Sequence, residues 1–465
     1  MPTPPQAVTR QLAEVMAATQ YRDLSPNVVD ETRRALLDWL GSALAGSLEP
    51  PARMAQRLVA GFGASAEATV FGAPRSSAAG AALANGVASH ILELDDVHKG
   101  STLHAAAPVI PAALAVAERE HADGRAFILA VALGYEAALR IGEAVNPDHY
   151  RFWHPTGTAA TFGAAVAAGF LLALDSKQML DALGTAGTQA AGLWEFNADG
   201  AMSKHLHPGK AAFNGLVAAD LAAAGFSGAT RILEGERGFF AATARTFDHT
   251  RITDGLGTRW KITENCYKLH SCCGHTHSAI DVALDLRSRA RDINAIRIAT
   301  YAPGFEIVKE LNPRTPYAAK FSLAYCVAAA LAEGRVGLEQ FAPERFGPDG
   351  VRHSAIASLL GRTQISVADD LTARYPAAWP ARLAIELSDG SILSGAADYP
   401  RGNPENPVST ADLEAKFLTL VASRFGNDVA QFALTAVRSV DGCSDVATLF
   451  RDVVPNAATP MLALS

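Results

Sequence analysis

Small residues at helical spacing dominate the first half of the chain and restrict what it can fold into. They lie on nearly every face of the predicted helices, and a helix without a polar face is buried on most sides. One further stretch, 25–46, opens with Ser25 and Pro26, a good N-cap followed by proline at the first helical position. We therefore expect closely packed helices from about residue 8 to 260. The small-residue stretches are 78–96, 108–124, 125–145, 157–175 and 209–226.

The pattern changes after about residue 265. The stretches 293–303 and 363–369 are short and β-branched, and 381–397 alternates apolar residues around Asp389-Gly390, which predicts a β-hairpin. Helical stretches lie between these strands, and a helical pattern returns after about residue 409. At 465 residues the chain is too long for one ordinary core. We predict a large all-helical domain built from residues 1–266 and 401–465, with an α+β domain, residues 267–400, inserted between them.

Charge and cysteine content exclude several classes of protein. The formal net charge is −7 at pH 7, whereas nucleic-acid binders usually carry a basic patch. No uninterrupted apolar run of about 18 residues occurs, and the first ten residues contain no apolar signal-peptide core. Five cysteines, three of them crowded between positions 266 and 273, indicate a reduced intracellular protein. We expect a cytoplasmic protein that binds neither nucleic acid nor membrane.

Four loops share one design, a polar segment with histidine or lysine followed by the start of a small-residue helix. They hold 8 of the 13 histidines, at 93–104, 154–156, 204–210 and 268–277. Helix N-termini offer free N–H groups and the positive end of the dipole, so added Lys and His favour a carboxylate or phosphate. We expect the loops to meet in one positive pocket for a small anion. Any single histidine is equally well explained as a helix-capping donor.

The segment 266–277 holds three cysteines, three histidines and a lysine, but its cysteines are adjacent or six apart, which does not suit zinc or disulfide chemistry. Zinc sites use paired ligands at C-x₂₋₄-C or H-x₃₋₅-H spacing, and C-x-x-C is absent. An iron site helped by the acidic first loop stays open as an alternative, but we expect no metal and no organic cofactor. Walker A, G-x-S-x-G and G-x-G-x-x-G motifs are also missing. Acid–base chemistry by side chains remains, with cations stabilising an enediolate.

The chain resembles the MmgE/PrpD family over nearly its whole length. The resemblance is carried by HILELDDVHKGSTLHAAAPVIPAAL, HPTGTAATFGAA, KHLHPGKAAFNG, YKLHSCCGHTHSAID and AAKFSLAYCVAAAL, in this order. Its members include 2-methylcitrate dehydratase, cis-aconitate decarboxylase and iminodisuccinate epimerase, which act on small di- or tricarboxylates without a redox cofactor. The resemblance implies a helical domain from both chain ends, a smaller α+β lid, an active site between them and a homodimer.

The same resemblance points to individual residues. It implies catalytic roles for Asp95, His104, His154, Lys204, Lys268 and Tyr325. With the chemistry of the side chains it implies substrate-binding roles for Glu93, Asp96, Tyr150, His207, Cys273 and His275. The chain departs from its relatives at Val97, where many have threonine, and at Ala105, where many have proline. In decarboxylases of the family a histidine lies near the position of Cys273, whereas here the histidines are His275 and His277.

The leading hypothesis is a lyase that removes a proton next to a carboxylate and expels water from a citrate-like acid such as 2-methylcitrate. Lys204 and Lys268 would hold carboxylates, His104 or an acid of the first loop would be the base, and His154 or Tyr325 the acid. The nearest alternative is an epimerase of an amino-dicarboxylate such as iminodisuccinate, with Tyr150 as the second proton donor. A decarboxylase, a metal-dependent hydratase and a non-catalytic carboxylate binder are further alternatives.

Overall fold

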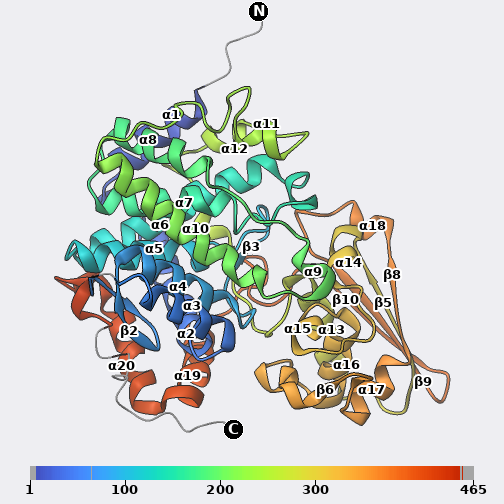
Figure 1. Cartoon of the computed structure of the whole chain (residues 1–465). Helices are drawn as coiled ribbons and strands as arrows, with labels where there is room; N and C mark the ends of the chain where they lie inside the picture. Colours follow the sequence, from blue (N-terminus) through green and yellow to red (C-terminus); the bar gives the residue numbers. More distant parts are fainter. Residues whose placement is uncertain (1–6, 64, 451–452, 454–465) are drawn as a thin grey trace, which may run out of the picture.

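The two largest hydrophobic cores among the described residues lie in different parts of the chain. The structure is a computed structural model that describes residues 7–63, 65–450 and 453, so both ends of the predicted helical domain lie outside the described residues. The larger core draws on residues 8–267 and 408–453, and the second on residues 272–385. Figure 1 shows the two parts side by side, with helices on the left and the sheet on the right. The described helices include none that is both long and apolar enough to cross a membrane.

The larger part is built from long helices with small residues at their contacts. Gly134 on α6 and Gly163 on α7 face each other so closely that a Cβ at Gly163 would lie 2.4 Å from the Gly134 carbonyl oxygen. Ser25 caps α2 by accepting a hydrogen bond from the Val28 N–H, with Pro26 at the first helical position, as predicted. The long helices are α1 (Val8–Ala18), α2 (Pro26–Gly46), α3 (Pro50–Ala60), α4 (Ala78–His90), α5 (Ala106–Arg119), α6 (Gly124–Val145), α7 (Ala159–Leu171), α8 (Ser176–Gly187) and α10 (Ser203–Ala223). Three short helices are α9 (Phe196–Asp199), α11 (Phe239–Thr243) and α12 (Thr250–Thr253).

The C-terminal helices return to this part, as the sequence predicted. Helix α19 (Thr410–Phe425) packs on α2, and α20 (Asn427–Arg438) packs on α19. The turn after α20 contacts the start of α6, where the Gly124 N–H donates to the Cys443 carbonyl at 2.9 Å. Both chain ends therefore contribute to one core.

The smaller part is a four-stranded mixed sheet with helices on one face. The strand order is β10-β9-β5-β8, in which β5 and β8 are parallel and the other neighbours antiparallel. The predicted hairpin is present as β9 and β10, and Gly390 in its turn has a φ of 84°. The strands are β5 (Ile293–Thr300), β8 (Thr363–Val367), β9 (Ala381–Leu387) and β10 (Ile392–Ala397), with a small pair β6 (Phe346–Gly347) and β7 (Gly350–Val351).

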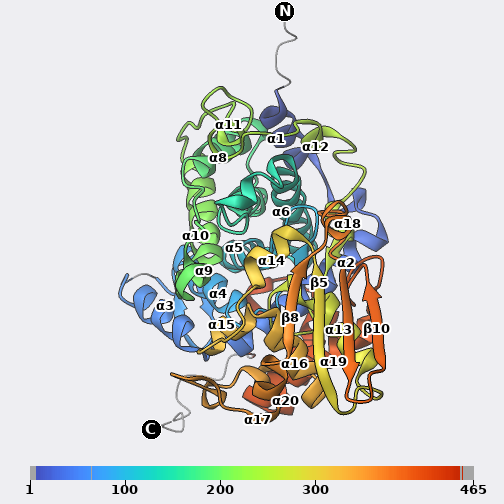
Figure 2. The same ribbon diagram turned by 90° about the vertical axis from the view of Figure 1, so that its right-hand side faces the viewer.

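Helices cover the sheet on the side that faces the helical part. In Figure 2 the sheet faces the viewer, and α13 and α16 lie behind it. The helices are α13 (His277–Leu286), α14 (Ala302–Val308), α15 (Pro316–Lys320), α16 (Leu323–Glu333), α17 (Ser354–Leu360) and α18 (Asp369–Thr372). This arrangement agrees with the predicted helical and α+β composition of the two parts. The boundaries at 267 and 400, and the role of the smaller part as a lid, stay predictions.

The larger part is not all-helical, which corrects the prediction. It contains a pair β1 (Ala68–Val70) and β2 (Ala73–Ser76), and β3 (Val97–His98) pairs with β4 (Asn265–Cys266). Strands of two to four residues are too short to show a period-2 pattern, so the sequence did not reveal them. The second pair matters for the site, because it fastens the first polar loop to the segment that opens the 266–277 region.

We predict that Gly124→Ala weakens the packing of the C-terminal return. A Cβ at Gly124 would lie 1.5 Å from the Val440 carbonyl oxygen, so the turn must move. Overpacking of this kind should lower the free energy of unfolding by about 2 kcal/mol, measured by urea denaturation. Gly442→Ala is the matched control in the same turn, because a Cβ there meets nothing within 4 Å. Equal stability of the two variants would contradict this contact.

Candidate active site

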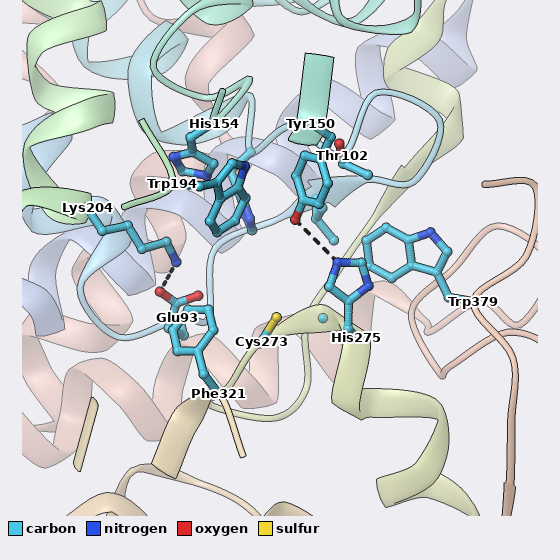
Figure 3. Close-up of a pocket in the computed structure, with 13 residues that line it drawn as sticks. Glu93, Thr102, Tyr150, His154, Trp194, Lys204, Cys273, His275, Phe321 and Trp379 are labelled. Atoms are coloured by element: carbon cyan, nitrogen blue, oxygen red, sulfur yellow. Dashed lines mark hydrogen bonds and ion pairs between the residues drawn. The ribbon is translucent and has the colours of Figure 1, made fainter. Parts of the chain in front are cut away.

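One pocket lies where the polar loops of the helical part meet the 266–277 segment. Its cavity volume is about 20 Å³, so the pocket is narrow in this structure. Figure 3 shows side chains from both parts of the chain pointing into it. The lining residues are Glu93, Val97, Thr102, His104, Tyr150, His154, Trp194, Lys204, Cys273, Gly274, His275, Phe321 and Trp379. All four predicted loops contribute at least one of them.

A buried ion network forms the floor of the site. Lys204, in the first turn of α10, is paired with Glu93, and Lys268 lies 3.4 Å from the other Glu93 oxygen. Burial alone would raise the pKa of Glu93, but Lys204 and then Lys268 outweigh it and hold the pKa well below its usual range. Glu93 also has a φ of 57°, a costly conformation for a residue with a side chain. The cations expected to make a positive pocket are therefore already paired with acids.

Asp95 lies between two histidines. Its Oδ2 accepts from His90 Nδ1–H at 2.7 Å and lies 3.3 Å from His104 Nδ1. His104 Nδ1 also contacts the Asp96 carbonyl at 2.6 Å, so this nitrogen carries the hydrogen and Nε2 is unprotonated. Burial lowers the pKa of His104 to about 4 despite the opposing effect of Asp95. His104 is thus a neutral, oriented imidazole at the pocket wall, as a general base requires.

His154 completes this wall. It lies in the turn before α7, where its N–H donates to the Gly192 carbonyl at 2.9 Å. Its Nδ1 lies 3.1 Å from Nδ1 of His207, which is half-buried on α10 and does not line the pocket. Burial and then the neighbouring His207 lower the pKa of His154 well below its usual value. His154 is therefore a neutral hydrogen-bonding group rather than a fixed cation.

Tyr150 and His275 form a second hydrogen-bonded pair in the lining. The Tyr150 hydroxyl lies 3.3 Å from His275 Nε2, and the dashed line in Figure 3 marks this contact. Tyr150 belongs to the 3₁₀ turn η2 (His149–Arg151) of the helical part, whereas His275 belongs to η4 (Gly274–Thr276) at the start of α13. Burial raises the pKa of Tyr150 well above 10, so its hydroxyl stays protonated and can act as a proton donor.

The remaining lining is apolar or uncharged. Val97, Trp194, Phe321 and Trp379 surround the polar groups, and Trp379 lies 4.6 Å from the His275 ring between ring centres. Burial raises the pKa of the Cys273 thiol to about 12, so this thiol is neutral and unsuited to nucleophilic catalysis. The lining excludes water from around the polar groups, which strengthens their electrostatic effect on a bound anion.

Several predicted site residues do not reach the pocket. Tyr325 is buried in the second core and donates to the Gln340 carbonyl, so the expected role as an acid is not supported by its position. Asp96 points away and accepts from Tyr135 and Asn265 at 2.7 and 2.8 Å. It also accepts from the Ala106 N–H at the start of α5, so it holds the loop rather than the substrate. Lys268 and Asp95 lie directly behind the lining, where they pair with lining residues.

Other residues of the site were missed from the sequence. His90 ends α4 and has a buried Nε2 without a hydrogen-bond partner among the described residues. Lys320 is buried and donates to the Leu92 carbonyl at 2.7 Å, which supports the turn that carries Glu93. His90 lies in a stretch with a helical pattern, and Lys320 lies in a stretch with a pattern typical of the family. The available signal in each case was a polar residue in an otherwise apolar helix. Phe321 and Trp379 carried no local signal.

Two groups of side chains resemble metal sites. Ring nitrogens of His90, His104 and His154 lie within 4.8 Å of one another, so these three side chains could hold a metal ion. His98, Glu143 and Glu264 form the other group. The Lys261 ammonium already lies 3.0 Å from Glu143 and 3.1 Å from Glu264, where a cation would bind. In the described part of the chain, the second group therefore already holds a cation, whereas the three histidines of the first have no cation between them.

Comparison with known proteins identifies the family. The model of the MmgE/PrpD N-terminal domain matches residues 10–251, and that of the MmgE/PrpD C-terminal domain matches residues 270–441. The chain belongs to the MmgE/PrpD family. The resemblance drawn from the polar loops is thus confirmed at the level of the family.

Curated relatives in the family align over almost the full chain. A cis-aconitate decarboxylase-like protein, oryM, of Aspergillus oryzae is 28% identical, covering 96% of this chain and 97% of its own. The cis-aconitate decarboxylase of Aspergillus terreus is 25% identical over 95% of both chains. The human cis-aconitate decarboxylase is 26% identical, covering 97% of this chain and 95% of its own.

We predict that Lys204→Met lowers the free energy of unfolding by about 3 kcal/mol, because it leaves Glu93 as an undercompensated buried charge. Adding Glu93→Gln should restore part of this loss, measured by urea denaturation. Lys309→Met is the control, since its pair with Glu306 is exposed and worth no more than about 0.5 kcal/mol. A double variant as unstable as Lys204→Met alone would show that the pair does not carry the effect.

Proposed function

We propose that this MmgE/PrpD protein is a lyase that needs no cofactor and acts on a small di- or tricarboxylate through an enediolate. The observation that carries the proposal is that two proton-transfer groups line one cavity. They are an oriented, neutral His104 and a protonated Tyr150 beside His275. Such a pair removes a proton from carbon and protonates a leaving group without a redox or metal cofactor.

Dehydration of a citrate-like hydroxy acid uses both proton-transfer groups, His104 and Tyr150. His104 Nε2 takes the proton next to a carboxylate, and the electron pair moves into the carboxylate to give the enediolate. Lys204, the nearest cation in the lining, stabilises this added charge together with the Lys268 behind it. The C–O bond then breaks as Tyr150 gives its proton to the leaving hydroxyl, which departs as water. Proton return from His104 to Tyr150, through solvent, resets the site.

Decarboxylation is the second candidate, and the relatives favour it. Proteins named cis-aconitate decarboxylase or decarboxylase-like align over 95% or more of this chain. Loss of CO₂ from such an acid leaves the same kind of carbanion, which needs one proton at carbon. The apolar side chains Trp194, Phe321 and Trp379 would help, because departure of neutral CO₂ is easier where a carboxylate is poorly solvated.

A single assay distinguishes the reactions. The enzyme is incubated in D₂O with 2-methylcitrate, citrate, cis-aconitate and an iminodicarboxylate, and products are followed by proton NMR with a chelator present. A new alkene and water loss from a hydroxy acid supports dehydration, and CO₂ release from cis-aconitate supports decarboxylation. Exchange with inversion and no alkene would instead identify an epimerase. Absence of turnover on every acid, or turnover lost on chelation, would reject the proposal.

We predict that His104→Gln lowers kcat by about 100-fold or more, the usual contribution of a general base. Tyr325→Phe is the control, because its hydroxyl lies away from the pocket, and it should keep kcat. A large loss of kcat in Tyr325→Phe with intact folding would restore it to the catalytic set and contradict this arrangement.

The pH dependence of kcat/KM should also report His104. A base must be unprotonated, so activity is lost as the pH falls through the pKa of His104 in the folded enzyme, about 4. An acidic limb near the ordinary histidine value of 6.5 would show that another group, or a differently placed His104, acts as the base. The profile is measured with stability checked at each pH.

A further inference from the structure

Tyr150 in the pocket lining begins a chain of three hydrogen-bonded side chains that leads away from the pocket. His275 Nε2 lies 3.3 Å from the Tyr150 hydroxyl, and His275 Nδ1 lies 2.5 Å from the hydroxyl of Tyr301, which follows β5. Tyr301 is fully buried and does not line the pocket. Tyr150 can act as the proposed acid only if its hydroxyl hydrogen points into the cavity rather than toward His275.

The direction of the Tyr150 hydroxyl hydrogen follows from the acceptor that the Tyr301 hydroxyl hydrogen needs. Among the described residues His275 Nδ1 is the one hydrogen-bond partner of the Tyr301 hydroxyl. A buried hydroxyl hydrogen without an acceptor is costly, so Tyr301 O–H donates to Nδ1. A neutral imidazole with an acceptor at Nδ1 carries its hydrogen on Nε2. His275 Nε2–H therefore donates to the Tyr150 oxygen, and the hydrogen of Tyr150 is left to point into the cavity.

The reverse order of donors and acceptors leaves the Tyr301 hydroxyl without an acceptor in the described part of the chain. If Tyr150 donated to Nε2, His275 would carry its hydrogen on Nδ1 and donate it to the Tyr301 oxygen. The Tyr301 hydrogen would then have no acceptor among the described residues, in surroundings made by His275 and the stacked ring of Tyr375. The packing of Tyr301 thus favours one of the two tautomers of His275.

We infer that Tyr301 is a positioning residue that fixes the Nε2–H tautomer of His275 and thereby makes Tyr150 the hydrogen donor to the bound acid. When Tyr150 gives its proton to the leaving group, the Nε2–H of His275 stabilises the phenolate that remains. Tyr301 touches neither substrate nor reacting atoms and acts through His275. The inference deepens the proposed function and rests on it for the step that Tyr150 performs.

The first test is independent of any substrate. The full-length protein is labelled with ¹⁵N-histidine, and the signals of His275 are assigned by their loss in His275→Gln. Two-bond ¹H–¹⁵N correlations then show which ring nitrogen carries the hydrogen. The Nε2–H form in the wild type, shifted toward Nδ1–H or a mixture in Tyr301→Phe, is the expected result. An Nδ1–H form in the wild type would overturn the inference.

The second test is a kinetic double-mutant cycle with the substrate found in the D₂O assay. Tyr150→Phe should lower kcat by about 100-fold, as expected for a lost general acid. Tyr301→Phe should lower kcat by about 10-fold at unchanged KM, the lower end of what loss of a partner that orients a functional histidine costs. The double variant should match Tyr150→Phe alone, because Tyr301 acts only through Tyr150.

Tyr375→Phe is the matched control. Its ring stacks on Tyr301 with centres 5.2 Å apart, but its buried hydroxyl has no hydrogen-bond partner among the described residues. It should keep wild-type kcat. Equal losses in Tyr375→Phe and Tyr301→Phe, or additive losses in the double variant, would show a merely structural role and overturn the inference. If no polycarboxylate is turned over, the proposed function fails and the tautomer measurement alone decides the inference.

Discussion

The buried pairing of Glu93 with Lys204 and Lys268 is the constraint on which the site depends. It joins the turn after α4, the start of α10 and the segment after β4, which are far apart in the sequence. Charged groups with almost no solvent contact are stable only when paired, so these segments are held together more strictly than apolar contacts alone would require. Lys320 adds a fourth segment, because it donates to the Leu92 carbonyl next to Glu93.

The same pairing determines how an anion can bind. Glu93 and Asp95 balance Lys204 and Lys268, and the pocket histidines with lowered pKa values add no fixed positive charge. A substrate carboxylate therefore competes with Glu93 for Lys204 and otherwise relies on an uncharged donor such as Tyr150. A balanced site of this kind has little attraction for anions in general. It stabilises extra charge where Lys204 can be reached, which favours the enediolate over the ground state.

Much of this arrangement could be predicted from sequence patterns. What could not be predicted depends on contacts that the sequence does not show locally. Small-residue helices, the Asp389-Gly390 hairpin and the return of the C-terminal helices each leave a local pattern, and all are present. The four loops with His and Lys before helix starts all contribute to one pocket, because loops at helix ends converge where helices pack together. Residue type does not show where a side chain points.

The direction of each side chain explains which residues the sequence placed wrongly in the pocket and which it missed. Asp96 and Asp95 are neighbours in the irregular segment before β3, yet one faces Tyr135 and the other faces His90 and His104. Tyr325 has the chemistry of an acid but belongs to a helix whose packing buries it in the second core. Trp379 reaches the pocket only because the strand after it pairs in the sheet. Such placements depend on tertiary contacts that no local pattern encodes.

The residues around His104 and those around Tyr150 differ in which parts of the molecule supply them. His90, Asp95 and His104 all belong to the helical part, so the base is assembled within one core. Tyr150 also belongs to that part, but its partners His275 and Tyr301 belong to the smaller one. The proposed acid therefore depends on contacts between the two parts, whereas the Asp95–His104 pair of the proposed base lies within one of them.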